Sequence, residues 1–133
     1  MANYHLTAAD LMQVEVATIL DDASIKMAAG LMRLEGVRSL VILPHDETDA
    51  YGIITYSDIV FRVLAEGKSP DDVKVYEVMN KPIISVQPNL RLKYIARLFR
   101  QTGIGHLAVV KGNELLGILS MTDLVTEGIT EPD

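Results

Sequence analysis

The chain has 133 residues, a net charge of −6 and 49% hydrophobic side chains, so we expect a packed core in one domain or two very small ones. It contains no cysteine, which excludes disulfide bonds, thiol nucleophiles and cysteine-bound metal sites. The acidic balance, without a cluster of lysine and arginine, argues against binding to a nucleic-acid polymer.

The first half of the chain predicts one strand, a helix, two more strands and a second helix. Ser24 is a suitable N-cap, apolar residues then recur at helical spacing, and Gly36 suits the end of the helix. The other apolar runs are short and rich in β-branched residues, which favours strands. The expected elements are a strand near 17–19, a helix between Ser24 and Gly36, strands 40–43 and 52–55, and a helix through 59–64.

The second half predicts the same order of elements. It follows a stretch rich in glycine, serine, proline and aspartate at 67–73, which we interpret as a linker. The expected elements are a strand at 84–86, a helix through 92–99 that ends at Gly103, strands 107–110 and 117–120, and a short helix at 124–125.

The two halves are an internal repeat. Residues 12–43 align with 79–110 at a constant offset of 67, so that Gly36 falls on Gly103, and the offset then becomes 65 because one turn is shorter. We therefore expect one β-α-β-β-α unit at 7–67 and another at 74–127. A unit of about 60 residues is marginal alone, so we expect the two to pack together in an α/β (α+β) fold.

One polar pattern occurs in both repeats, at 52–58 and 117–123. In each, a glycine and two aliphatic residues precede a hydroxyl residue, and a second hydroxyl and an aspartate follow. One interpretation is purely structural, with Ser57 or Thr122 as a helix N-cap and the aspartate interacting with the helix dipole. The other is a binding site, because a carboxylate accepts hydrogen bonds from a ribose diol and neighbouring hydroxyl and N–H groups tolerate a phosphate.

The doubled pattern and the order of elements resemble a tandem pair of CBS domains, the regulatory module named after cystathionine β-synthase. The resemblance covers about residues 7–127. It implies two units packed about a pseudo-two-fold axis, with two clefts that take AMP, ADP, ATP or S-adenosylmethionine as a regulatory ligand. No obligatory cofactor and no metal are implied.

The resemblance also implies that each cleft combines the aspartate pattern of one repeat with the first two strands of the other. One site would contain Thr55, Ser57, Asp58, Ile83, Ile84, Ile104, His106 and Ala108. The other would contain Ser120, Thr122, Asp123, Val16, Ala17, Val37, Arg38, Ser39 and Val41.

The sequence departs from the family pattern at several of these positions. Val41 and Ala108 stand where relatives often carry proline, which removes the fixed φ of that residue. Arg38 offers a planar guanidinium to a phosphate, whereas Gly105 fills the equivalent place in the second repeat. We expect the two clefts to differ in affinity for phosphate, with the Asp123 cleft preferring the more phosphorylated ligand. His106 is either a packing residue or a group that polarises phosphate.

The sequence leaves two functions open. The first is a regulatory adenine-nucleotide sensor that changes conformation and modulates a partner, such as an unidentified enzyme or transporter. The alternative is a structural dimerisation module with no bound nucleotide. We do not expect an enzyme, because no Ser-His-Asp arrangement or metal-ligand spacing is visible.

The family also implies a homodimer. We expect a cytoplasmic protein without a membrane span, because the amino terminus lacks an export signal and no apolar run approaches about 18 residues.

Overall fold

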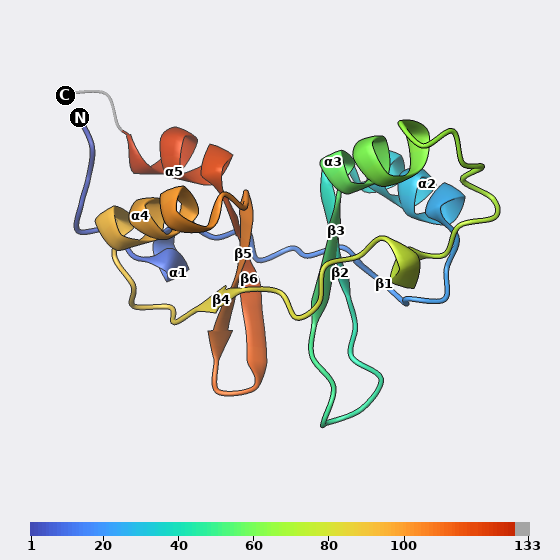
Figure 1. Cartoon of the computed structure of the whole chain (residues 1–133). Coiled ribbons are helices and arrows are strands. Elements are labelled where there is room, and N and C mark those ends of the chain that lie inside the picture. The colour runs from blue at the N-terminus through green and yellow to red at the C-terminus, as the bar shows by residue number, and fades with distance from the viewer. Residues whose placement is uncertain (130–133) are drawn as a thin grey trace. The chain divides into compact units, whose positions relative to one another are not determined.

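The computed structural model describes residues 1–129, which form two compact units (Figure 1). The central unit comprises Val16–Ile83. The terminal unit combines Met1–Glu15 with the described residues from Ile84 onward. The β-α-β-β-α order predicted for each repeat is confirmed, and each unit contains one three-stranded sheet.

The central unit has strand order β1-β2-β3, with β1 parallel and β3 antiparallel to β2. Its core lies between the sheet and α2, where Ile25, Ala28 and Met32 are buried against Leu40 and Ile42 of the middle strand. The elements are β1 (Thr18–Ile19), α2 (Ile25–Glu35), β2 (Ser39–Ile42), β3 (Gly52–Thr55), α3 (Tyr56–Ile59), a π-helical turn (Val60–Leu64) and a 3-10 helix (Val75–Glu77).

The predicted ends of α2 are confirmed. The Ser24 hydroxyl accepts a hydrogen bond from the Met27 N–H at 3.1 Å, which satisfies one of the free donors of the first turn. Gly36 has φ 67° and ends the helix in the left-handed conformation that glycine adopts without steric cost.

The terminal unit repeats this arrangement with strand order β4-β5-β6. Its core gathers one face of α4 around Ile95 and Phe99, together with Leu107 and Leu119 of the two long strands. The elements are α1 (Ala8–Leu11), β4 (Ser85–Val86), α4 (Leu92–Thr102), β5 (His106–Lys111), β6 (Glu114–Ser120) and α5 (Met121–Gly128).

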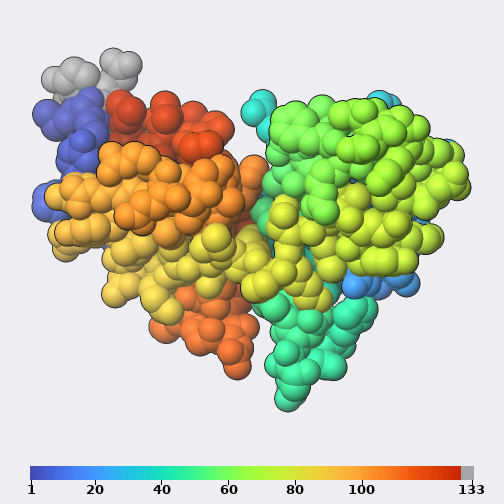
Figure 2. Space-filling view, in the orientation of Figure 1, coloured from blue at the N-terminus to red at the C-terminus, as the bar shows by residue number. Residues whose placement is uncertain are grey.

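The first residues of each sequence repeat pack against the other repeat. α1 stands at the start of the first unit expected at 7–67, yet it buries Ala8 and Leu11 in the core of the terminal unit. Figure 2 shows the amino-terminal residues, in blue, beside the orange and red residues of α4 and α5. The equivalent 3-10 helix stands at the start of the second unit expected at 74–127, and Val75 and Val78 lie in the core of the central unit. The compact units therefore differ from the sequence repeats by this exchange.

Candidate functional site

The polar pattern of the first repeat lies where β3 passes directly into α3. Thr55 is the N-cap, and its hydroxyl accepts from the Asp58 N–H at 3.4 Å. In return, Oδ2 of Asp58 accepts from the Thr55 N–H and from the Thr55 hydroxyl, both at 2.9 Å. This reciprocal pair is a capping box, which satisfies free donors at the start of a helix.

The second repeat builds the same box between β6 and α5. Oδ2 of Asp123 accepts from the Ser120 N–H at 2.8 Å and from the Ser120 hydroxyl at 3.0 Å. The Ser120 hydroxyl accepts from the Asp123 N–H at 3.3 Å. Asp123 is only 8% exposed, whereas Asp58 is half-buried.

The predicted N-caps, Ser57 and Thr122, are wrong by two residues. Each helix begins immediately after its strand, so the last strand residue, Thr55 or Ser120, is the cap. Ser57 and Thr122 lie exposed in the first turn, where the Ser57 hydroxyl contacts that of Thr55 at 3.0 Å.

Each aspartate also accepts a hydrogen bond from a side-chain amide. In the terminal unit, Nε2 of Gln13 donates to Oδ1 of Asp123 at 3.1 Å. In the central unit, Nδ2 of Asn80 lies 3.1 Å from both carboxylate oxygens of Asp58. The polar contacts of each aspartate are therefore the capping box and one amide.

These amides were missed by the sequence analysis, although the repeat contains a signal for them. The offset of 67 that aligns the repeats places Gln13 on Asn80, so a carboxamide stands at the same position in both. What the sequence did not reveal is that this position lies beside an aspartate more than 20 residues away in one case and more than 100 in the other.

The glycine of the pattern allows the amide-bearing segment to approach the sheet. Gln13 exchanges two backbone hydrogen bonds with Ile118, at 2.8 and 3.0 Å, beside Gly117. A Cβ atom on Gly117 would lie 2.6 Å from the Gln13 carbonyl oxygen. At Gly52 the corresponding atom would lie 3.2 Å from the carbonyl oxygen of Asn80. Absence of a side chain is thus a packing requirement at Gly117, whereas at Gly52 a methyl group would need its neighbours to shift slightly.

The strand residues expected to line a base lie on matched positions of the two sheets. Leu40 and Ile42 belong to the helix-covered core, so strand alternation places Val41 on the opposite face of its sheet. Ala108 stands between Leu107 and Val109 in the same way.

The remaining predicted residues divide between the units as follows. The central unit contains Val16, Ala17, Val37, Arg38, Ser39 and Ile83 together with Thr55, Ser57 and Asp58, and the terminal unit contains Ile84, Ile104 and His106 together with Ser120, Thr122 and Asp123. Ser39 pairs with Thr55 across the sheet, and His106 pairs with Ser120. The exposed Arg38 accepts a backbone hydrogen bond from Tyr56 at the start of α3. The predicted combination of residues from both repeats in one cleft stays a prediction.

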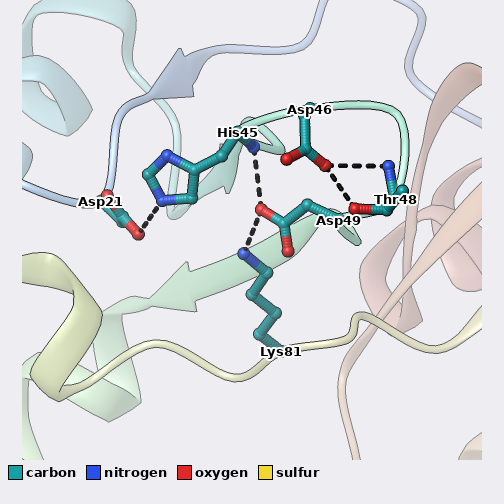
Figure 3. A network of polar contacts seen from close by, with 6 residues as sticks. All are labelled: Asp21, His45, Asp46, Thr48, Asp49 and Lys81. Carbon is teal, nitrogen blue, oxygen red and sulfur yellow. Dashed lines mark hydrogen bonds and ion pairs between the residues drawn. The ribbon is translucent and has the colours of Figure 1, made fainter.

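A separate polar network lies in the connection between β2 and β3 (Figure 3). Nε2 of His45 is 2.7 Å from the Asp21 carboxylate, and the His45 N–H donates to Asp49 at 2.8 Å. The hydrogen bond to Asp21 raises the pKa of His45 above its usual 6.5. The hydrogen bond from Nζ of Lys81, at 2.6 Å, lowers the pKa of Asp49 to about 2. From the sequence, this loop was expected only to be a longer connection than its counterpart in the second repeat.

Within residues 1–129, no group of three or more His, Cys, Asp or Glu side chains is placed to hold a metal ion. No helix in this part of the chain is both long and apolar enough to cross a bilayer.

The repeated units, their capping boxes and their topology together define a family. The model of the CBS domain matches the chain twice, at residues 8–65 and 75–129. The chain belongs to the CBS-domain family, as the resemblance predicted, and pairs of these domains are commonly regulatory modules.

Two relatives illustrate the range of similarity. The CBS domain-containing protein YhcV of Bacillus subtilis is 32% identical over 115 residues, which cover 86% of this chain and 80% of the relative. An uncharacterized protein of Methanopyrus kandleri is 35% identical over 95 residues, which cover 71% of this chain but only 48% of the relative. The chain thus spans about half the length of the archaeal protein.

Solved structures share the fold. A hexameric CBS-CP12 protein from bloom-forming cyanobacteria is 41% identical, with a TM-score of 0.90 over 92% of this chain and 71% of that one. An uncharacterized conserved protein from Pyrococcus horikoshii has a TM-score of 0.86 over 98% of both chains at 23% identity, which indicates a common fold.

Proposed function

We propose that this CBS pair is a regulatory module that binds an adenosine derivative, namely AMP, ADP, ATP or S-adenosylmethionine. The observation that carries the proposal is the doubled aspartate. In each unit one carboxylate oxygen is fixed by the capping box, and the carboxylate also accepts from an amide of an exposed residue. A carboxylate held in this way is suited to accept hydrogen bonds from a ribose diol.

The ligand acts through conformation in this proposal, and the protein has no catalytic step. Ligand binding changes the surface that the module presents to a target protein, and this coupling requires a different affinity in two states. We also propose self-association as a homodimer, which agrees in kind with the hexameric assembly named for the cyanobacterial relative.

Calorimetric titration with the four ligands tests the proposal. We expect saturable binding of at least one of them, and loss of one site each in Asp58→Asn and Asp123→Asn. Asparagine keeps an oxygen for the N-cap N–H, so these variants retain more of the capping box than alanine does. Asp71→Asn is the matched control, because Asp71 is exposed and forms only a surface ion pair with Lys26 at 3.5 Å.

One observation favours the structural alternative. Both aspartates already accept hydrogen bonds from the capping box and from an amide, so neither carboxylate needs a ligand as a hydrogen-bond donor. Absence of binding for all four ligands near millimolar concentration would contradict the proposed function and favour a module that interacts without nucleotide.

A further inference from the structure

The side-chain amides of Gln13 and Asn80 contact the same carboxylates to which the proposed function assigns the ribose. Both donors of the capping box, the N–H and the hydroxyl of Ser120, bind Oδ2 of Asp123. Nε2 of Gln13 donates to the other carboxylate oxygen, Oδ1. In the central unit the Asn80 amide lies equally close to both oxygens of Asp58, while the Thr55 donors use Oδ2. A carboxylate offers about four acceptor positions, and the capping box fills two of them on Oδ2, so the two hydroxyls of a vicinal diol and the amide together need more positions than remain.

The backbone of each amide residue is fixed, so only its side chain is free to leave. Asn80 exchanges two backbone hydrogen bonds with Ile53, at 2.9 and 2.8 Å, and Gln13 does the same with Ile118. Both residues are exposed, so the amide finds water when it leaves the carboxylate. Displacement of the amide is then a change of side-chain torsions without any loss of sheet pairing.

We propose that Gln13 and Asn80 are internal competitors of the ligand, an inference that rests on the proposed function. Each amide occupies the carboxylate in the free protein and leaves it when a vicinal diol binds. The apparent association constant is the intrinsic one multiplied by the fraction of molecules in which the amide is away from the carboxylate. The two residues therefore set the concentration range over which the module responds, without being required for recognition of the ligand.

The effect is larger at Asp123. A hydrogen bond to a carboxylate strengthens as water is excluded, and Asp123 is 8% exposed while Asp58 is half-buried. Nδ2 of Asn80 contacts both carboxylate oxygens of Asp58, but water also competes for this half-buried carboxylate. We therefore expect the Asn80 amide to be displaced more easily than that of Gln13.

The test uses Asn80→Leu and Gln13→Met, which preserve the approximate size of the side chain and remove the donor. Each is made in the variant that leaves one site, Asn80→Leu with Asp123→Asn and Gln13→Met with Asp58→Asn. The probes are AMP and 2′,3′-dideoxy-AMP, which lacks the diol. We expect AMP to bind about five- to tenfold more tightly to Gln13→Met, and less strongly enhanced binding to Asn80→Leu.

Three controls isolate the amide. Asn80→Gln and Gln13→Asn keep a donor and are expected to stay close to the parent affinity. Asn89→Leu and Gln101→Met make the same substitutions at exposed positions away from both aspartates and are expected to change nothing. Asn80→Ala and Gln13→Ala repeat the experiment with a smaller side chain, and circular dichroism establishes that each variant is folded.

The outcomes separate the two proposals. Tighter binding of AMP without tighter binding of dideoxy-AMP supports the competitor role. If the parent binds AMP and the folded variants bind it equally or more weakly, or if dideoxy-AMP gains as much as AMP, the competitor role is wrong and the proposed function stands. If the parent does not bind AMP up to millimolar concentration but the donor-free variants do, the competitor role is supported in its strongest form. Absence of binding of AMP, ADP, ATP and S-adenosylmethionine in parent and variants alike removes both proposals.

Discussion

The two units build one capping box from the same pattern, yet they enclose its aspartate to different degrees. In the terminal unit, Asp123 is nearly inaccessible, and the Gln13 segment lies so close that a Cβ on Gly117 would overlap its carbonyl oxygen. In the central unit, Asp58 is half-buried and the approach at Gly52 is looser. The same motif is therefore more or less accessible according to how closely the segment that contains Gln13 or Asn80 approaches its sheet.

The largest expected effect follows from this difference at the glycines. Gly117→Ala places a methyl group 2.6 Å from backbone oxygen, which cannot move without breaking the bridge between Gln13 and Ile118. We expect a loss of about 2–3 kcal/mol in the free energy of unfolding, against about 1 kcal/mol or less for Gly52→Ala. Urea unfolding followed by circular dichroism measures both. Equal losses would mean that the two segments approach their sheets equally closely.

The next effect concerns the aspartates themselves. Asp123→Ala leaves the N–H and the hydroxyl of Ser120 without their acceptor at a part-buried position, and we expect a loss of about 2 kcal/mol. Asp58→Ala removes the same box where water replaces the carboxylate, so about 1 kcal/mol is expected. Thermal unfolding of the two variants beside Asp71→Ala provides the measurement. A larger loss in the central unit would contradict the role given to burial.

The smallest effect is a dependence on pH in the network around His45 of the central unit. Folding raises the pKa of His45, chiefly through its hydrogen bond to Asp21, with Asp49 adding to the effect and Lys81 opposing it. The stabilisation from protonated His45 is therefore complete below pH 6.5 and is lost as the pH rises through the raised value. The side chain is 63% exposed, so the effect is modest.

Melting temperatures of the parent protein and His45→Gln between pH 5 and 8 measure this contribution. We expect the difference between them to shrink as the pH rises. The Asp49–Lys81 pair behaves in the opposite sense. Because the pKa of Asp49 is lowered to about 2, its contribution is present above about pH 3.8 and is lost as the pH falls toward 2. A constant difference for His45→Gln would contradict the assigned ion pair.

Local patterns in the sequence predicted the fold well where neighbouring residues determine the structure. The strand at 52–55 and the helix ends at Ser24, Gly36 and Gly103 follow from apolar spacing, capping and the freedom of glycine, and all are confirmed. The cap position was misjudged because Thr55 and Ser57 both carry hydroxyls. The spacing of three residues from Thr55 to Asp58 is nevertheless that of a capping box, and it identifies Thr55 as the N-cap.

The site was predictable only in part. The aspartates were visible as a repeated polar pattern, but their amide partners lie far away in the sequence and are brought close because the first residues of each repeat pack in the other unit. No local periodicity encodes such an exchange. Alignment of the repeats identifies Gln13 and Asn80 as equivalent, and only the fold shows that each of them meets a carboxylate.

The exchange of segments also means that the terminal unit is built from two separate stretches of the chain. During synthesis the central unit, Val16–Ile83, emerges from the ribosome before the strands of the terminal unit. Residues 1–15 can therefore pack only after these later strands have emerged. Residues 2–3 then pair with residues 128–129, because Ala2 forms a bridge with Ile129 and the Asn3 N–H donates to the Gly128 carbonyl at 2.9 Å. A circular permutant opened between Ile83 and Ile84 would carry each unit on one uninterrupted stretch of chain.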